Sequence, residues 1–305
     1  MMTKTIRLAT RASKLALVQA EIVKSKLEAF LLDRATVTIV PLTTQGDRDL
    51  TKPLHEIGGK GIFIKEIEQA LLDDLADIAV HSLKDITTNL AKGLHLSGFL
   101  KPEGQRDVLV FNKKDSQFSA LPENATIATG SLRRKALLKY LRPDIQTLPI
   151  RGNVLTRLDK IKSLPVEGIL LSEAGLIRLK LTDLNQEALD PNLFIPAPGQ
   201  GVIALQTRDG DDFAIECAKA INDSHQELIS TSDLHFLSHV GLDCKAPLGL
   251  YTTEQQDRLR MKLFLSNEPL TQFYLKEVDF ATKERIKAID ELAHMTIEWL
   301  KAHEH

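Results

Sequence analysis

The stretch that decides the fold is IRLATRAS, residues 6–13. Its apolar part, Ile6 to Thr10, predicts a short strand, and the residues from Leu15 to Phe30 follow with the spacing of an amphipathic helix. Ser13 stands where the N-cap of that helix is expected. A strand that leads straight into a helix starts a βαβ unit, so this opening predicts an α/β domain with a mainly parallel sheet.

The same opening recurs in the middle of the chain. Thr126 to Thr129 is a strand candidate, Gly130-Ser131 is a turn and cap, and Leu132 to Leu141 is a helix candidate. Both openings place hydroxyl side chains at a strand end against a helix N-terminus, where free amide hydrogens and the helix dipole favour anions. We therefore expect two α/β units that each bind negative groups at the carboxyl edge of the sheet.

A third part follows a change of pattern near residue 224. The segment from Pro191 to Gly201 is rich in proline and glycine and indicates a crossing, and Val202 to Leu205 reads as a strand returning to the first sheet. Beyond it lie two helix candidates, at 226–240 and 282–301. Three strand candidates are grouped between them, at 247–252, 259–265 and 271–279. This grouping favours a small α+β domain. The expected domains are residues 1–102 with 198–222, residues 103–197, and residues 223–305.

Composition argues against several classes of protein. Over 305 residues, 39 lysines and arginines face 41 aspartates and glutamates, so binding of nucleic acid by bulk charge is not expected. No apolar run approaches a membrane span, and the N-terminal residues do not resemble a signal peptide. Two cysteines, Cys217 and Cys244, cannot form a disulfide framework. These features predict a cytoplasmic protein without membrane or nucleic-acid partners.

Positive charge is concentrated between residues 125 and 158. This segment holds seven basic residues and one acidic residue, Asp144. A solvated helix face is enough to explain Lys135, Lys139 and Arg142. The remaining four lie at strand–helix junctions, where the planar guanidinium group suits carboxylates or phosphates; they are Arg133, Arg134, Arg151 and Arg157. Together with Arg11, they predict a site for a ligand that carries several negative groups.

Two other segments carry candidate chemistry. Gly58-Gly59-Lys60-Gly61 lacks the pattern of a phosphate-binding loop, and a hinged loop that presents Lys60 is as plausible as a plain turn. His81-Ser82-Leu83-Lys84-Asp85 follows a buried-type strand. A carboxylate at that position, Asp85, can act as an acid and base or stabilise a developing cation, although an ordinary strand-end turn explains it equally well.

The two cysteines differ in their surroundings. Cys217 lies on a predicted amphipathic helix, where a buried apolar role is expected, whereas Cys244 lies in a polar loop with nearby proline and glycine. A rival hypothesis places a zinc ion on His235 and His239 with Asp243 or Cys244. It lacks a second cysteine pair and the glutamate of a His-Glu-x-x-His motif, so we expect no metal.

Taken in order, these segments resemble the porphobilinogen deaminase family along nearly the whole chain. The matching motifs are Ala9–Ser13, Gly58–Gly61, Ala79–Asp85, Arg106-Asp107, Ser131–Arg134, Arg151–Val154 with Thr156-Arg157, Ala174–Leu176, Pro196–Gly201, and Cys244 with Pro247 and Gly249.

The resemblance implies two doubly wound α/β domains like those of periplasmic binding proteins, plus a small α+β C-terminal domain. It implies a monomeric transferase that joins four porphobilinogen molecules into hydroxymethylbilane on a dipyrromethane cofactor, held by a thioether to Cys244, with no metal. Asp85 would be catalytic. Residues that would bind the cofactor are Lys84, Thr129, Ser131, Arg133 and Arg134, and those that would bind substrate are Arg11, Ser13, Lys60, Arg151, Arg157 and Arg178.

One departure bears on efficiency. The family usually has Gly-Gly before the cofactor cysteine, where this chain has Leu242-Asp243. A neighbouring negative charge disfavours a thiolate, so slow cofactor loading is expected. Two alternatives stay open: a polyanion-binding protein without catalysis, which would use the same cationic residues, and a deaminase paralogue with impaired turnover, which Leu242-Asp243 suggests.

Overall fold

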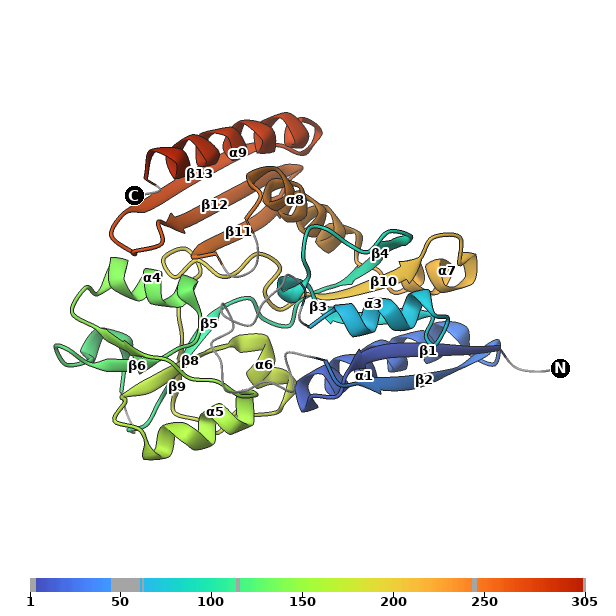
Figure 1. Ribbon diagram of the computed structural model, residues 1–305, viewed down its shortest axis with the longest axis horizontal. Helices are drawn as coiled ribbons and strands as arrows, with labels where there is room; N and C mark the ends of the chain where they lie inside the picture. Colours follow the sequence, from blue (N-terminus) through green and yellow to red (C-terminus); the bar gives the residue numbers. More distant parts are fainter. Residues whose placement is uncertain (1–3, 45–60, 62, 114–115, 243–245, 304–305) are drawn as a thin grey trace. The chain divides into compact units, whose positions relative to one another are not determined.

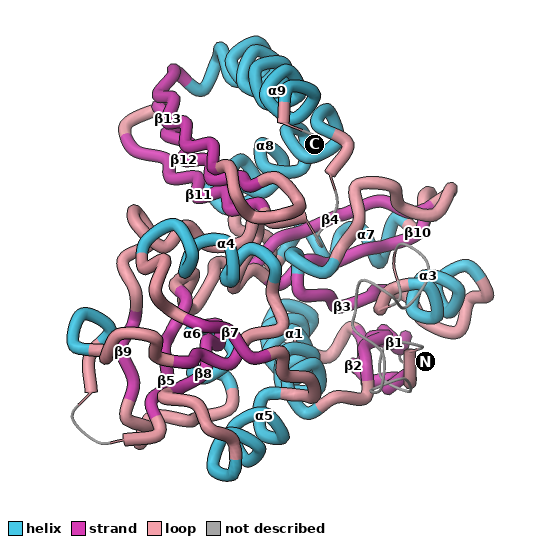
Figure 2. Tube along the Cα trace, turned by 60° about the vertical axis from the view of Figure 1, so that its left-hand side comes forward, coloured by secondary structure: helices cyan, strands magenta, loops and turns pink. Residues whose placement is uncertain are grey.

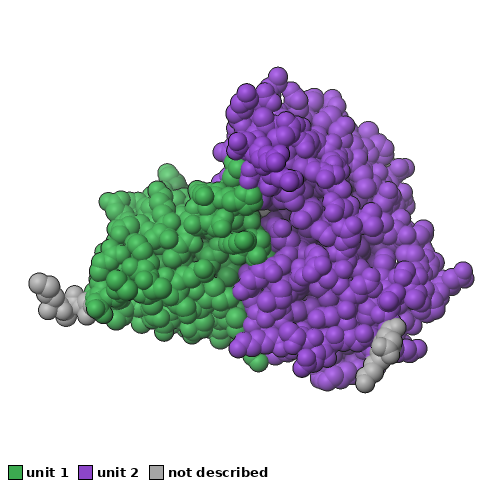
Figure 3. All heavy atoms as spheres, turned by 180° about the vertical axis from the view of Figure 1, so that it is seen from behind, with its two compact units in different colours: residues 1–102, 201–228 green, residues 103–200, 229–305 purple. Residues whose placement is uncertain are grey.

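A computed structural model describes residues 4–44, 61, 63–113, 116–242 and 246–303. The chain divides into two compact units, residues 1–102 with 201–228 and residues 103–200 with 229–305 (Figure 3). Each of the α/β units contains a five-stranded sheet, and a three-stranded antiparallel sheet follows near the C-terminus (Figure 1). The predicted fold class, two α/β sheets plus a small C-terminal α+β part, is confirmed. The three expected domain boundaries stay a prediction.

The first unit is built on the sheet that IRLATRAS opens. Its strands, in spatial order, are β2 (Ala35–Leu42), β1 (Lys4–Arg11), β3 (Ile78–Ser82), β10 (Ile203–Arg208) and β4 (Leu94–Leu100), and its helices are α1 (Lys14–Leu31), α3 (Lys65–Leu72) and α7 (Asp212–Ala220). Alternate residues of β1 face opposite sides: Leu8 packs with α1 and α7, and Ala9 packs with α3. The sheet is therefore covered by helices on both faces.

The second unit repeats this plan. Its strands, in spatial order, are β7 (Gln146–Leu148), β6 (Thr126–Ala128), β8 (Gly168–Ser172), β5 (Asp107–Phe111) and β9 (Gln186–Ala188), and its helices are α4 (Leu132–Leu141), α5 (Val154–Lys160) and α6 (Glu173–Arg178). The short 3₁₀ turns η2 (Phe118–Ala120) and η3 (Ile161–Ser163) lie in its connections. Position for position, β6 stands where β1 stands in the first unit, and the recurrent βα opening is confirmed.

The expectation of mainly parallel sheets is confirmed for four of the five strands in each sheet, and a single strand in each runs against the others. In the first sheet β1 pairs in parallel with β2 and β3, but β10 pairs antiparallel with β3 and β4. In the second sheet β6 pairs in parallel with β7 and β8, but β5 pairs antiparallel with β8 and β9. The physical reason is the same in both: β10 and β5 follow the chain's crossings between the units and run against their neighbours.

The C-terminal sheet is an antiparallel meander. It is formed by β11 (Leu248–Gln255), β12 (Arg258–Ser266) and β13 (Phe273–Ala281), with α8 (Ser224–Val240) before it and η4 (Thr282–Glu284) and α9 (Arg285–Ala302) after it. The two helices lie on one side of the sheet (Figure 2). On the other side, Phe264 joins the core of α4, where its ring lies 5.9 Å from that of Tyr140. This shared core explains why the sheet groups with residues 103–200.

A buried ion cluster lies in the second unit. The carboxylate of Asp107, at the start of β5, is fully buried between two arginines of α4. Its Oδ2 accepts from Nη1 of Arg133 at 2.6 Å, and its Oδ1 accepts from Nε of Arg134 at 2.8 Å. Burial alone raises the pKa of Asp107, but the charges and hydrogen bonds of Arg133 and Arg134 outweigh it and hold that pKa well below its usual range.

The same arginines also bind backbone. Nη1 of Arg133 donates to the carbonyl of Ile195 at 2.7 Å, and Nη1 of Arg134 donates to the carbonyl of Leu170 at 2.7 Å. The cluster thus ties α4 to β5, to β8 and to the segment that follows β9. No helix in the part of the chain that the structure describes combines the length and the apolar character needed to cross a bilayer.

We expect Asp107→Ala to destabilise the second unit severely. It would leave two buried guanidinium groups without their counter-charge, and removing one partner of a buried ion pair costs about 3–5 kcal/mol. Asp107→Asn keeps one acceptor oxygen, so its melting temperature should lie between those of Asp107→Ala and the unchanged chain. The measurement is thermal unfolding followed by circular dichroism.

The matched control is Asp144→Ala. Asp144 is also paired with an arginine, Arg142, at 2.7 Å, but both side chains reach solvent. Exposed ion pairs contribute little to the free energy of unfolding, so the melting temperature of this variant should be close to that of the unchanged chain. Equal effects of the Asp107 and Asp144 variants would contradict the structural role given to the buried cluster.

Candidate functional site

At the carboxyl edge of the first sheet, β1 ends in Arg11 and α1 begins. The Ser13 Oγ accepts from the amide of Ala16 at 3.4 Å and so caps α1, which confirms the predicted N-cap. The guanidinium carbon of Arg11 lies 4.1 Å from the ring centroid of Phe63, in a cation–π contact that orients the side chain. A serine hydroxyl that caps a helix still has its own hydrogen to donate to an anion.

The adjacent strand β3 delivers Lys84 and Asp85 to the same edge. They follow β3 in the short 3₁₀ turn η1 (Leu83–Asp85), whose first amide donates to the carbonyl of Val202 at 3.0 Å. Nε2 of Gln19 donates to Ser82 Oγ at 2.8 Å, which fixes the strand end to α1. The Asp85 carboxylate is partly buried, and it makes no hydrogen bond and no ion pair within the described part of the chain.

A buried histidine of β3, His81, links this strand to β10 through a hydrogen bond. Nε2 of His81 lies 3.0 Å from Oε1 of Gln206, and Nε2 of Gln206 donates to Glu68 at 2.8 Å. Because the Gln206 oxygen accepts, Nε2 of His81 carries the hydrogen. Burial, with a further contribution from the charge of Arg11, lowers the pKa of His81 to about 4, so the imidazole is neutral at neutral pH. Sequence reasoning gave His81 no role, because its partner on β10 is far away in the chain.

In the second unit, two loops meet at the carboxyl ends of β6 and β7. The amide of Thr129 donates to the carbonyl of Leu148 at 2.9 Å. A Cβ on Gly130 would lie only 2.8 Å from the carbonyl oxygen of Ile150, so a side chain there would clash with backbone. This close approach brings the Thr129–Ser131 loop against the residues just before Arg151.

Four predicted site residues lie on these two loops and the helices that follow them. Ser131 caps α4, with its Oγ accepting from the amide of Arg134 at 3.4 Å, and Thr129 Oγ1 accepts from the Ser131 amide at 3.2 Å. Nε of Arg157, on α5, donates to the carbonyl of Gly152 at 2.6 Å. Nη1 of Arg151 is buried and has no hydrogen-bond partner among the residues that the structure describes.

The other predicted arginines of this unit are held inside it. Arg133 and Arg134 expose only 5% and 8% of their side chains and spend donors on Asp107 and backbone carbonyls. Arg178, on α6, donates from Nε to Glu103 at 2.6 Å. Through these contacts the three arginines stabilise the fold of the second unit. Their predicted contacts with a ligand stay predictions.

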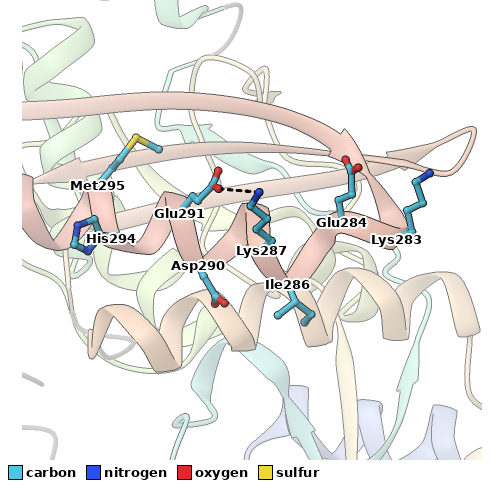
Figure 4. Close-up of a pocket in the computed structure, with 8 residues that line it drawn as sticks. All are labelled: Lys283, Glu284, Ile286, Lys287, Asp290, Glu291, His294 and Met295. Carbon is cyan, nitrogen blue, oxygen red and sulfur yellow. Dashed lines mark ion pairs between the residues drawn. The ribbon is translucent and has the colours of Figure 1, made fainter.

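Two predicted site residues, Lys60 and Cys244, lie outside the described residues, as does Asp243. Cys217 is confirmed as a buried apolar residue of the first core, and burial raises the pKa of its thiol to about 11. A hollow of about 840 Å³ lies along α9 instead, lined by side chains of η4 and α9 (Figure 4). It contains none of the predicted site residues.

Comparisons with known proteins agree on one family. The family model described as porphobilinogen deaminase, dipyromethane cofactor binding domain, matches residues 6–216. The porphobilinogen deaminase of Lachnospira eligens is 42% identical over 284 residues, which cover 92% of this chain and 95% of the relative. That of Syntrophotalea carbinolica is 41% identical over 261 residues, which cover 86% of this chain and 82% of the relative.

One solved structure similar to the chain is a probable amino-acid ABC transporter extracellular-binding protein, YtmK of Bacillus subtilis. Its TM-score is 0.42 at 11% identity, with 77% of this chain and 96% of that chain covered. This likeness is too weak to bear on function. The family model and the curated relatives are far stronger, and they show that the chain belongs to the porphobilinogen deaminase family.

Proposed function

We propose that the chain is a working porphobilinogen deaminase. In this reaction four porphobilinogen molecules are joined head to tail into hydroxymethylbilane, and each joining releases ammonia. The proposal rests on family membership over most of the chain and on the chemistry of the two sheet edges. We further propose that the enzyme is cytoplasmic, as its sequence favours, and monomeric, as the family resemblance implies.

The observation that carries the proposal is the buried Nη1 of Arg151. A buried donor without a hydrogen-bond partner destabilises the folded protein by roughly 1–3 kcal/mol. An acceptor atom supplied by a ligand would therefore bind favourably at this group. Each pyrrole of the substrate carries an acetate and a propionate, and the growing chain is therefore a polyanion. A ligand carboxylate at Arg151 would relieve the cost and form a charge-assisted hydrogen bond.

The residues around Arg151 fit a dipyrromethane. Thr129 and Ser131 supply hydroxyl groups on the loop that approaches the carbonyl of Ile150, at the N-terminus of a ten-residue helix, where negative charge is favoured. Linked to Cys244, the dipyrromethane supplies the pyrrole carbon to which the first substrate unit is joined. We propose that Lys84, Arg133 and Arg134 complete the cofactor set.

For the substrate, we propose anion-binding residues of each sheet edge, together with Arg178 of α6 and with Lys60, which lies outside the described residues. Arg11 and Ser13 lie at the first edge, and Arg151 and Arg157 at the second. Arg178 and Lys60 are added on the family resemblance. Arginines hold and orient the carboxylates, which leaves the reacting aminomethyl carbon to be positioned against Asp85.

Asp85 is proposed as the catalytic residue. When the C–N bond of the substrate breaks, its electron pair leaves with ammonia and positive charge develops on the carbon and the pyrrole nitrogen. A carboxylate near the pyrrole N–H stabilises this charge more strongly in the transition state than in the ground state, which raises turnover. The same carboxylate can accept the proton lost when the new C–C bond has formed. Among the residues that the structure describes, this carboxylate has no hydrogen bond or ion pair, which leaves it available for both tasks.

The test of the function is the intact mass of the purified protein. We expect the mass of one added dipyrromethane, and we expect Cys244→Ser to lose both this mass and nearly all activity. Cys217→Ser, which changes a buried core residue, should keep the added mass. Protein without added mass but with tight polyanion binding would favour the non-catalytic alternative. Slow, partial loading would favour an impaired paralogue, because the negative charge of Asp243 beside Cys244 disfavours the thiolate.

We expect Arg151→Met to block cofactor assembly or to trap partial chains, because it removes a charged donor while keeping an unbranched side chain. Loss of one partner of a buried charge-assisted contact costs about 2–5 kcal/mol in binding. Lys135→Met removes the same charge from the exposed face of α4 and is the control. Mass spectrometry of enzyme–intermediate complexes checks both variants, and matching behaviour of the two would refute the carboxylate-binding role of Arg151.

We expect Asp85→Asn, in cofactor-loaded protein, to bind substrate and to lose on the order of a hundredfold or more in turnover. The amide keeps the shape of the side chain but removes the negative charge and the proton acceptor. Asp85→Glu should retain some activity because its charge survives. Single-turnover kinetics separates chemistry from loading, and near-normal elongation by loaded Asp85→Asn would move catalysis to another residue.

A further inference from the structure

Three metal-binding side chains converge between the two C-terminal helices. His235 and His239 lie one turn apart on α8, with ring centroids 4.3 Å apart. Asp290 comes from α9, and Figure 4 shows its carboxylate pointing from α9 toward the neighbouring helix. Sequence spacing singled out the two histidines, but it could not supply Asp290, because the packing of α9 against α8 brings it there.

The distances suit a single ion. One nitrogen of each imidazole and one carboxylate oxygen lie within 4.8 Å of one another. Asp290 Oδ1 is 2.7 Å from His235 Nε2 and 3.5 Å from His239 Nε2. A tetrahedral ion with bonds of about 2.0–2.1 Å holds its ligand atoms roughly 3.3 Å apart, so small side-chain rotations close the site.

The hydrogen bonds already present prepare one histidine for coordination. Nδ1 of His239 lies 2.9 Å from the carbonyl oxygen of His235. A carbonyl only accepts, so Nδ1 carries the hydrogen and the lone pair of Nε2 is directed at the Asp290 carboxylate. A histidine that donates its second ring N–H to a carbonyl is the usual arrangement in metal sites, because that bond fixes the tautomer and the ring.

The electrostatics call for a cation at this point. Oδ1 of Asp290 and Nε2 of His239 are both electron-rich, and they face each other at 3.5 Å. Either an additional proton or a metal ion relieves the repulsion. All three side chains are accessible, with exposed fractions of 25% for His235, 46% for His239 and 45% for Asp290, so an ion from solution can enter.

We propose that His235, His239 and Asp290 form a binding site for a divalent transition-metal ion of the zinc class, with water completing the coordination. Two imidazoles and one carboxylate are a ligand set that suits zinc and its neighbours and suits magnesium and calcium poorly. The bound ion clamps α8 to α9 on the side of the C-terminal sheet that both helices cover. This site is separate from the proposed catalytic residues and does not depend on the proposed reaction.

The test is titration of the full-length, tag-free, cofactor-loaded protein with Zn²⁺ after chelator treatment, by calorimetry and thermal unfolding, with Co²⁺ absorption as a spectroscopic probe. We expect one ion per chain, a rise in melting temperature, and the Co²⁺ bands of a nitrogen–oxygen site. His239→Ala and Asp290→Asn should each weaken binding at least tenfold and remove the thermal shift. Both residues are partly exposed, so both variants should fold.

Two controls keep the assignment specific. His294→Ala removes a histidine of α9 that lies 3.2 Å from a carboxylate, Glu298, and that belongs to no group of three metal-ligating side chains among the described residues. Cys217→Ser removes the buried thiol of the first unit and is expected to keep the cofactor. Both should bind Zn²⁺ like the unchanged chain. The proposal is overturned if the unchanged chain binds no Zn²⁺ at about 100 μM, if His239→Ala and Asp290→Asn still bind it normally, or if either control variant loses it.

Discussion

The second unit depends on one buried negative charge. Asp107 is out of contact with water, yet two arginines from a single helix surround it. Such a cluster is stable only if every member is satisfied, and here the remaining donors reach backbone carbonyls on β8 and on the segment after β9. Nε2 of Gln200 adds a further bond to the same carboxylate at 3.2 Å. One side chain thereby sets the position of α4 on the sheet, and α4 in turn presents Ser131 at the sheet edge.

Much of the fold follows from local pattern. IRLATRAS and the stretch around Gly130 each combine an apolar strand, a hydroxyl cap and an amphipathic helix, and both form the predicted βα openings. The C-terminal meander is also readable, because its strands alternate and its helices are long. No strand was expected at β4, β5 or β9. β9 has only three residues, and β4 and β5 pair with strands far away in the sequence, so their identity depends on distant partners.

In the candidate site, too, features that depend on local sequence could be predicted and features that depend on distant partners could not. Cap residues such as Ser13 could be predicted, since capping is local chemistry. The partners of Arg133 and Arg134 could not be predicted, because a cluster of basic residues looks the same in sequence whether it faces a ligand or a buried aspartate 26 or 27 residues earlier. The neutral state of His81 and the position of Asp290 were hidden for the same reason. Charge in a sequence is visible at once, but the counter-charge that a fold brings to it is not.

The place of β10 has a consequence for how the protein is made. This strand lies between β3 and β4, near the centre of the first sheet, yet the chain between β4 and β10 builds the whole second sheet. During synthesis from the N-terminus, β4 therefore leaves the ribosome long before the strand that joins it to β3. The first sheet can be completed only after residue 208 has emerged, by which time the second sheet has all its strands. Of the two five-stranded sheets, the one whose first strand is translated earlier is thus the one that is completed later.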